Sequence, residues 1–137
     1  MRIPRPLSDL SQRELIKKLD KVFSEYIRQR DKGICFTCGK QQAWKLTDNG
    51  HYIRRGVMLF RFNEKNCHCQ CKRCNSWMEG EKVIYRQNLV KLYGEGEVDM
   101  MERESHKTYK WHKCDLIWQI QAYSQKVKDL DILQSEK

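Results

Sequence analysis

The sequence has no long hydrophobic run: no segment approaches the roughly 18 apolar residues that a membrane-spanning helix needs. Residues 1–6 contain no apolar stretch of the kind found in secretory signal peptides. Internal repeats, low-complexity tracts and Gly/Ser linkers are also missing. We therefore expect neither export nor membrane insertion. A single domain spanning residues 1–137 is expected, because this length is usual for one domain.

The chain has fewer acidic than basic residues. The chain has 18 Asp and Glu against 27 Lys and Arg, which gives a formal net charge of +9. An excess of this sign favours a polyanionic partner, because each phosphate that is neutralised releases condensed counterions. Charged residues make up 33% of the chain, so little apolar surface is available for a core. A covalent or metal cross-link would stabilise such a core.

The cysteines suggest which cross-link is present. Four of the seven form two C-x-x-C pairs, Cys35/Cys38 and Cys71/Cys74. In a chain without a signal peptide this pattern predicts a metal site in a reducing cytoplasm, and not disulfides. Two such turns supply the four sulfurs of a closed, structural Zn²⁺ site. The 32 residues between the pairs exceed the spacing in a compact zinc ribbon, so we expect an inserted element.

The other three cysteines, Cys67, Cys69 and Cys114, are interpreted as packing residues. Cys67 and Cys69 would share one face of a strand, because side chains alternate along strands. Either of them is the alternative ligand if one C-x-x-C pair is misassigned.

Hydrophobic spacing predicts an α+β fold that is mainly helical. An N-terminal helix is expected at residues 8–32, with a capping box at residues 11–14 and Gly33 at its end. The central zone, residues 34–80, contains the cysteine pairs and a small ββα-metal (HNH-like) element. The C-terminal zone, residues 81–137, is predicted to be helical.

Short strands are expected in the central zone around residues 51–54 and 67–71, separated by a loop at 56–65. In the C-terminal zone we expect helices at residues 81–93, 96–105 and from Lys113 onward. Residues 129–137 are polar and are expected to fray.

The residues suited to phosphodiester hydrolysis lie between the cysteine pairs. His51 can act as the base that deprotonates water, since histidine titrates near neutral pH. Asn75 directly follows the second pair and can coordinate a divalent cation, Mg²⁺ or Mn²⁺, that neutralises charge on the phosphate. Asn66 would hold the loop and orient the imidazole. His, Asn and Asn in this order form the pattern of HNH nucleases.

Short motifs continue this pattern along most of the chain, over about residues 19–127. They are Tyr26-Ile27-Arg28, Cys35-x-x-Cys38, Asp48-x-Gly50-His51-Tyr52, Leu59-Phe60-Arg61-Phe62-Asn63-Glu64-x-Asn66, His68-x-Gln70-Cys71-x-x-Cys74-Asn75, Gly80, Tyr85-Arg86 and Gly94. With these motifs the sequence resembles the NinG (Rap) recombination proteins of lambda-like phages.

The resemblance implies a phage or prophage nuclease that acts in the host cytoplasm on branched DNA such as D-loops, Holliday junctions and forks. Cys71-x-x-Cys74-Asn75 is also similar to the zinc knuckle of the phage junction resolvase endonuclease VII, in which an Asn after the last Cys is a metal ligand. Junction cutting usually needs two active sites on opposed strands. We therefore expect a homodimer.

One position departs from the HNH pattern. Many HNH enzymes have a metal-binding Asp immediately before the catalytic His, where this chain has Gly50. Two candidates for the replacement ligand remain. Asp48 would reach the metal if the turn at residues 48–50 curls back, and His68 would lie two residues past Asn66 on the same strand face. The alternative for His68 is a structural histidine.

DNA contacts are expected from basic residues near this site, although each also suits a solvated surface charge. These candidates are Arg54, Arg55, Arg61, Lys72, Arg73 and Arg86. Any of the four tryptophans, Trp44, Trp77, Trp111 and Trp118, could stack on unpaired bases. For Trp111 and Trp118 we expect core packing instead, and His106 and His112 are expected at the surface.

The sequence leaves three functions open. The first is a metal-dependent endonuclease for branched DNA that leaves 5′-phosphate and 3′-hydroxyl ends. The second is a non-catalytic zinc module that binds DNA as a recombination mediator, favoured by the net charge and by Gly50. The third is a sequence-specific HNH nuclease, for which the chain offers no obvious additional recognition module.

Overall fold

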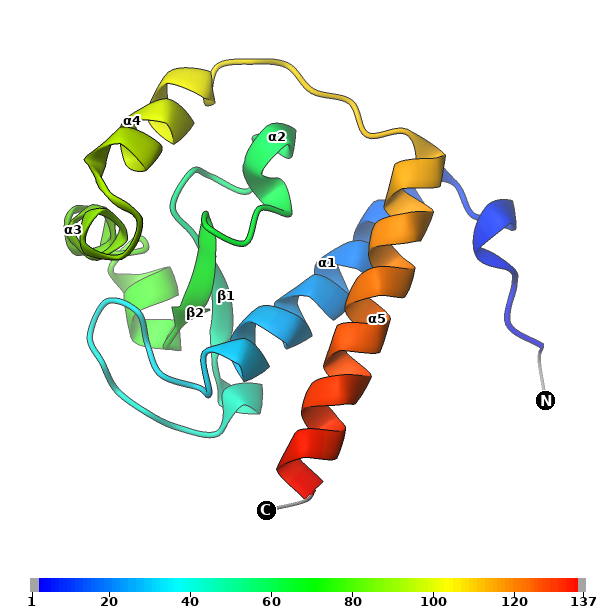
Figure 1. Ribbon diagram of the computed structural model, residues 1–137, viewed down its shortest axis with the longest axis horizontal. Helices are drawn as coiled ribbons and strands as arrows, with labels where there is room; N and C mark the ends of the chain where they lie inside the picture. Colours follow the sequence, from blue (N-terminus) through cyan, green and yellow to red (C-terminus); the bar gives the residue numbers. More distant parts are fainter. Residues whose placement is uncertain (1–2, 136–137) are drawn as a thin grey trace. The chain divides into compact units, whose positions relative to one another are not determined.

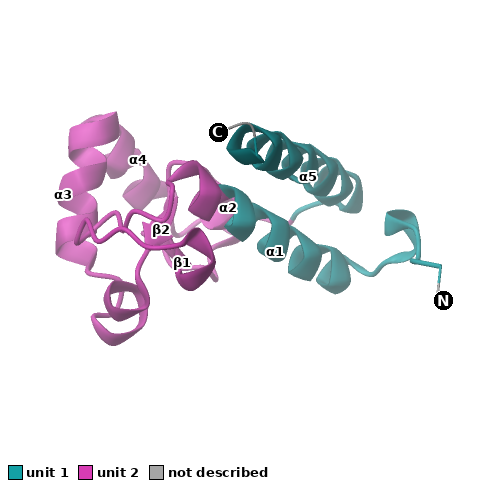
Figure 2. Cartoon of the chain, turned by 90° about the horizontal axis from the view of Figure 1, so that it is seen from below, with its two compact units in different colours: residues 1–26, 111–137 teal, residues 27–110 magenta. Residues whose placement is uncertain are grey.

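The computed structural model describes residues 3–135. The chain forms two compact units, residues 1–26 with 111–137, and residues 27–110 (Figure 2). Each of the two terminal helical zones predicted from the sequence is therefore divided between the units. Within the described residues, no helix is long and apolar enough to cross a membrane.

The first unit is helical and contains most of α1 (Gln12–Arg30) and all of α5 (Lys113–Ser135). The predicted capping box is confirmed. The Glu14 amide donates to Ser11 Oγ at 3.1 Å, and the Ser11 amide donates to Glu14 Oε1 at 3.4 Å. The ring of Phe23 on α1 meets the ring of Tyr123 on α5 edge-on, with centroids 4.9 Å apart.

Three predictions for α5 are wrong. The helix continues through the polar residues 129–135, which were expected to fray, while residues 136–137 lie outside the described part. Trp118 is 66% exposed and Cys114 is also exposed, although both were expected to pack. The exposure of Trp118 follows from the helix geometry. Leu116 and Ile120 are buried, and at 3.6 residues per turn position 118 faces away from both.

The second unit contains a two-stranded antiparallel sheet of β1 (Asp48–His51) and β2 (Cys67–Gln70) (Figure 1). Asp48 pairs with Gln70 and His51 pairs with Cys67, so the strands are in register over four residues. The first strand begins three residues before its predicted position. The predicted loop between the strands contains a short helix, α2 (Met58–Arg61).

The second strand leads through Cys71 into a π-helical turn, Arg73–Trp77, and then into α3 (Lys82–Tyr93) and α4 (Glu95–Glu104). Gly94 joins these two helices with a φ of 93°, a conformation that glycine adopts readily. The core of this unit is formed by Ile53, Val57, Phe60, Tyr85, Leu89, Val98 and Met101. It packs α3 and α4 against the segment that follows β1.

Candidate functional site

The two cysteine pairs come together as predicted. The sulfurs of Cys35, Cys38, Cys71 and Cys74 all lie within 4.8 Å of one another. The amide of Cys38 donates to the Cys35 sulfur and that of Cys74 to the Cys71 sulfur, each at 3.5 Å. Four close sulfurs, two of them already accepting amide hydrogen bonds, fit a thiolate metal site. The group could bind a metal such as zinc.

The four clustered cysteines do not share one electrostatic environment, since burial raises the pKa of Cys38 and raises that of Cys74 to about 12. Burial opposes ionisation of Cys35, but hydrogen bonds from Thr37 and from neighbouring backbone amides outweigh it and lower its pKa to about 6. Burial raises the pKa of Cys69 to about 11. Cys69 and Cys67 are fully buried on β2 and do not belong to the four-sulfur group. Their prediction as packing residues agrees with this placement.

Asn75 links the cysteine group to the first strand through two hydrogen bonds. Its backbone amide donates to the Cys71 carbonyl at 3.0 Å, and its side-chain amide donates to Asp48 Oδ2 at 3.1 Å. The other Asp48 oxygen accepts from the Lys72 ammonium at 2.8 Å. The structure thus brings together Asp48 and Asn75, two of the predicted ligands of the catalytic metal.

The ring of His51 is held by its Nε2 atom, which lies 3.0 Å from the carbonyl oxygen of Arg61. A carbonyl can only accept a hydrogen bond, so Nε2 must carry the proton in this contact. The neutral ring then has its lone pair on Nδ1, the form that can take a proton from water.

The loop that presents this carbonyl is held by Asn66, which is fully buried. Asn66 Oδ1 accepts from the Ile53 amide at 2.7 Å, and its Nδ2 donates to the carbonyls of Ile53 and Phe60, each at 3.1 Å. Phe60 directly precedes Arg61, whose carbonyl contacts His51. Asn66 therefore fixes the loop through which the imidazole is oriented.

His51 and the Asp48–Asn75 pair lie toward opposite ends of β1. Asp48 is opposite Gln70 in the ladder and His51 is opposite Cys67. Three residues of extended chain span about 10 Å. Side chains three residues apart on a strand also project from opposite faces, so β1 alone does not bring the His51 ring to the Asp48–Asn75 pair.

The packing around Gly50 explains why residue 50 cannot be an aspartate. A Cβ atom at this position would lie 2.0 Å from Gln70 Oε1. The Gln70 side chain is fixed there because it donates to the Gly80 carbonyl at 2.9 Å and to Thr37 Oγ1 at 3.1 Å. A side chain at residue 50 would therefore collide with the interior, and the nearest carboxylate on the strand is that of Asp48.

His68 lies in the interior of the second unit. Its ring stacks on Phe36 with centroids 4.0 Å apart, and its nitrogens lie 3.3 Å from the Tyr85 hydroxyl and 3.1 Å from the Tyr93 hydroxyl. Burial lowers its pKa to about 4. Because both nitrogens already have hydroxyl partners, the geometry favours the structural alternative for His68. Asp48 is the better candidate ligand.

The depressed pKa of His68 predicts an acid-sensitive fold. The unfolded chain protonates this ring near its ordinary pKa of 6.5, whereas the folded chain resists protonation until about pH 4. Stability is therefore expected to fall as pH decreases through this window, by at most about 3 kcal/mol. His68→Gln should lose this part of the pH dependence in urea unfolding at pH 7 and pH 4.5.

Titration of the other groups, including the four clustered cysteines, affects both proteins, so the difference between wild type and His68→Gln isolates the histidine. Equal changes in unfolding free energy between the two pH values would contradict the assignment.

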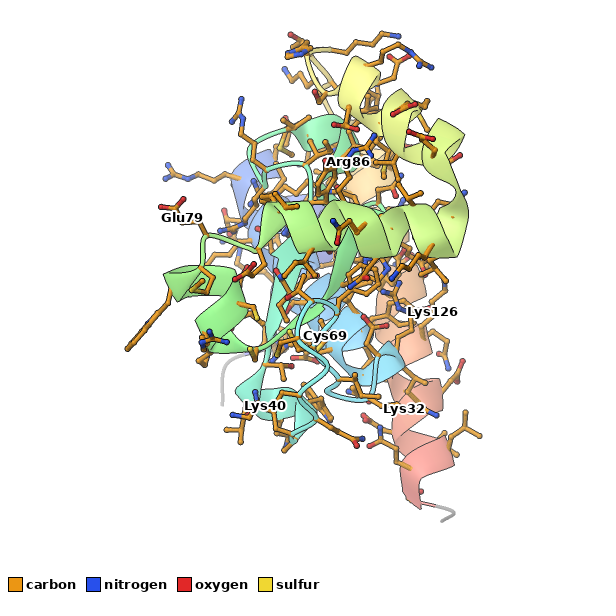
Figure 3. All side chains as sticks on the ribbon, turned by 90° about the vertical axis from the view of Figure 1, so that its left-hand side faces the viewer. Lys32, Lys40, Cys69, Glu79, Arg86 and Lys126 are labelled. Atoms are coloured by element: carbon orange, nitrogen blue, oxygen red, sulfur yellow. The ribbon has the colours of Figure 1, made fainter. Side chains whose placement is uncertain are left out.

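The predicted DNA contacts fall into two groups. Arg86 lies on the side of α3 that faces α4 (Figure 3) and binds Asp99 at 2.7 Å and Glu102 at 2.9 Å. The guanidinium thus joins two helices, and its DNA contact stays a prediction. Lys72 is paired with Asp48. Arg54, Arg55 and Arg73 are exposed and Arg61 is half-buried, with its Nη1 3.8 Å from Met58 Sδ.

Of the tryptophans, Trp77 is 85% exposed at the end of the π-helical turn. Trp44 is half-buried, with the guanidinium of Arg28 over its ring at 5.1 Å. Trp111 is also half-buried.

Two residues at the site were missed from the sequence. The Lys82 ammonium donates to the His51 carbonyl, and the Tyr85 hydroxyl donates to the Gly50 carbonyl at 2.7 Å. Both come from α3 and hold the backbone of β1. Lys82 belongs to none of the motifs, and the Tyr85-Arg86 motif does not indicate that the Tyr85 hydroxyl would contact β1.

The family model described as Bacteriophage Lambda NinG protein matches residues 5–132. Over 125 residues the chain is 35% identical to protein ninG of Escherichia phage lambda and to protein ninG of Salmonella phage P22. It is 34% identical to protein ninG of Escherichia phage 933W. The matches cover 88% of this chain but only 59–60% of each relative. No solved structure matches the chain.

Proposed function

The chain belongs to the bacteriophage lambda NinG protein family, and from this premise we propose that it is a metal-dependent HNH-type DNA endonuclease that cuts branched recombination intermediates. One observation carries the proposal. The cysteine group fixes Asn75 against Asp48, at 3.1 Å, on the same strand that presents His51. A base and two oxygen-bearing side chains are thereby held on one small scaffold.

Asp48 and Asn75 would hold the catalytic cation. Carboxylate and amide oxygens are the donors that Mg²⁺ and Mn²⁺ prefer, and the two side chains are already in contact. To bind a cation together, Asp48 has to exchange its Lys72 partner, and Asn75 has to present its oxygen. A bound cation would neutralise negative charge on the phosphate and on the leaving 3′-oxygen.

His51 would act as the general base. Its Nε2 proton is held by the Arg61 carbonyl, so Nδ1 is the atom that accepts a proton from the attacking water. As the water oxygen bonds to phosphorus, the bond to the 3′-oxygen breaks. The products carry 5′-phosphate and 3′-hydroxyl ends. The His51 ring and the Asp48–Asn75 pair project from opposite faces of β1, so acting on one phosphate would require the two groups to move together when DNA binds.

A specific observation favours a second candidate, a non-catalytic zinc module that binds DNA. Residue 50 has no carboxylate, and the one at Asp48 is paired with the Lys72 ammonium. This module would bind forks and junctions without cutting them. A homodimer is part of the first proposal, since two opposed strands have to be cut. Light scattering that finds only monomer on junction DNA would count against the homodimer.

The two candidates separate in a cleavage assay with purified protein on matched linear, forked, D-loop and four-way-junction DNA. The endonuclease should cut the branched substrates with Mg²⁺ or Mn²⁺ and not with EDTA. Binding of the same substrates without cutting in either metal would favour the DNA-binding module. A single fixed cut in linear duplex would favour a sequence-specific nuclease.

Asp48→Ala is expected to raise the Mg²⁺ concentration needed for half-maximal cleavage by about tenfold or more, because one of two protein oxygen ligands is lost. Titrating Mg²⁺ at fixed junction concentration measures the shift. Asp115→Ala removes an exposed carboxylate from the first turn of α5 and is the matched control. Equal metal requirements for the two variants would rule out Asp48 as a ligand.

A further inference from the structure

A cleft of about 610 Å³ opens where the chain leaves β1, directly after His51. Its floor is apolar, since Ile53 and Val57 are buried. Its walls carry Tyr52, Arg54, Lys82 and His106. A second cleft of about 320 Å³ shares Arg54 and His106 with it, so the two are neighbours. Together they extend the candidate site away from Asp48.

The cleft is positively charged. Arg54 and Lys82 line it, and the one carboxylate in its wall, Glu102, is offset by its 2.9 Å contact with Arg86. Lys82 is exposed, and its ammonium donates to the His51 carbonyl while lining the cleft. A charge-assisted hydrogen bond from such a cation to a phosphate is stronger than a neutral one.

Shape and chemistry together fit a nucleotide. The volume lies within the usual range for ligand pockets of about 300–1,000 Å³. An apolar floor beside a tyrosine ring suits a base, and the two cations suit its phosphate. Lys82 also donates to the His51 carbonyl, so a phosphate bound here would neighbour the residue proposed as the base.

We propose that this cleft binds one unpaired nucleotide of the strand next to the cut, with its phosphate held by Lys82 and Arg54 and its base on the Tyr52 side. The inference rests on the proposed nuclease function and adds a source of its substrate preference. A base inside a duplex is stacked and paired on both sides, and removing it costs a few kcal/mol. Branch points supply unpaired nucleotides that avoid this cost.

Binding of a short labelled single-stranded oligonucleotide, followed by fluorescence anisotropy in EDTA, tests the cleft without cleavage. Lys82→Gln should weaken binding about five- to tenfold at low salt and reduce the magnitude of the salt slope by about 0.7. Lys91→Gln removes the same charge from an exposed position on the same helix and is the control. Lys82→Arg should restore binding.

Equal affinities and salt slopes for Lys82→Gln and Lys91→Gln would overturn the proposal. If Lys82→Gln fails to fold, as judged by its thermal melt, Arg54→Ala replaces it under the same criterion, because Arg54 is exposed. The substitution should weaken binding of the matching duplex less than binding of the single strand. Equal losses would overturn the assignment of an unpaired nucleotide.

The cleft and the nuclease can fail separately. Wild-type protein that binds the oligonucleotide through Lys82 but cuts no branched DNA, in Mg²⁺ or Mn²⁺, would reject the nuclease and keep the cleft. Cutting of branched DNA that is undiminished in Lys82→Gln would keep the nuclease and reject the cleft.

Discussion

Replacing His51 with alanine is expected to reduce cleavage of junction DNA by about 10²–10⁴-fold, the usual contribution of a positioned general base. The expectation follows from the fixed ring, because its Nε2 proton contacts the Arg61 carbonyl at 3.0 Å and leaves Nδ1 to accept the proton. DNA affinity measured in EDTA should be nearly unchanged. Single-turnover rates at saturating protein measure the chemical step directly.

Two controls separate loss of the base from loss of structure. His112→Ala removes an exposed histidine from outside the second unit and should cut at the wild-type rate. Added imidazole should recover part of the activity of His51→Ala, which a merely unfolded site would not do. Cleavage by His51→Ala at the wild-type rate would refute His51 as the base, whatever the metal requirement.

The parts of this protein that the sequence predicts are those with a local chemical signature. Ser11 and Glu14 form the capping box because three residues separate the two groups that have to meet. Each C-x-x-C turn brings its own two sulfurs together, and the type of site follows from the four thiols. Asn75 lies next to the four-sulfur group because it directly follows Cys74.

The parts that the sequence does not predict depend on partners far away along the chain. The segment 48–51 contains no β-branched residue, and pairing with residues 67–70 decides that it is a strand. The ion pairs of Arg86 with Asp99 and Glu102 cannot be predicted from the sequence, because α4 supplies both carboxylates. Lys82 becomes part of the site only because α3 begins beside His51.

Gly50, which stands where many HNH enzymes have an aspartate, shows how a residue far away along the chain changes a motif. The sequence alone leaves both Asp48, three residues before His51, and His68, two residues after Asn66, as candidate replacements. Packing distinguishes them, because His68 lies between Phe36 and two tyrosine hydroxyls, whereas Asp48 meets Asn75. Burial cannot be deduced from the identity of a histidine.

The largest effect on stability is expected from Cys74→Ser. Structural zinc contributes about 10–16 kcal/mol in zinc-finger peptides, which matches or exceeds the roughly 5–15 kcal/mol stability of a typical domain. Removing one of the four sulfurs should therefore abolish metal binding and cooperative unfolding of the segment around it. Metal content by mass spectrometry and thermal melts followed by circular dichroism measure the two effects.

Cys114→Ser is the matched control, because this thiol is exposed on α5 and lies outside the four-sulfur group. It should keep the metal and change stability by no more than about 0.5 kcal/mol. Hydrogen exchange should locate the damage in Cys74→Ser to residues 35–77. A Cys74→Ser protein with wild-type metal content and an unchanged melt would show that the four sulfurs do not hold a structural metal. Loss of the metal should also abolish cleavage, since Asn75 is positioned through the Cys71 carbonyl.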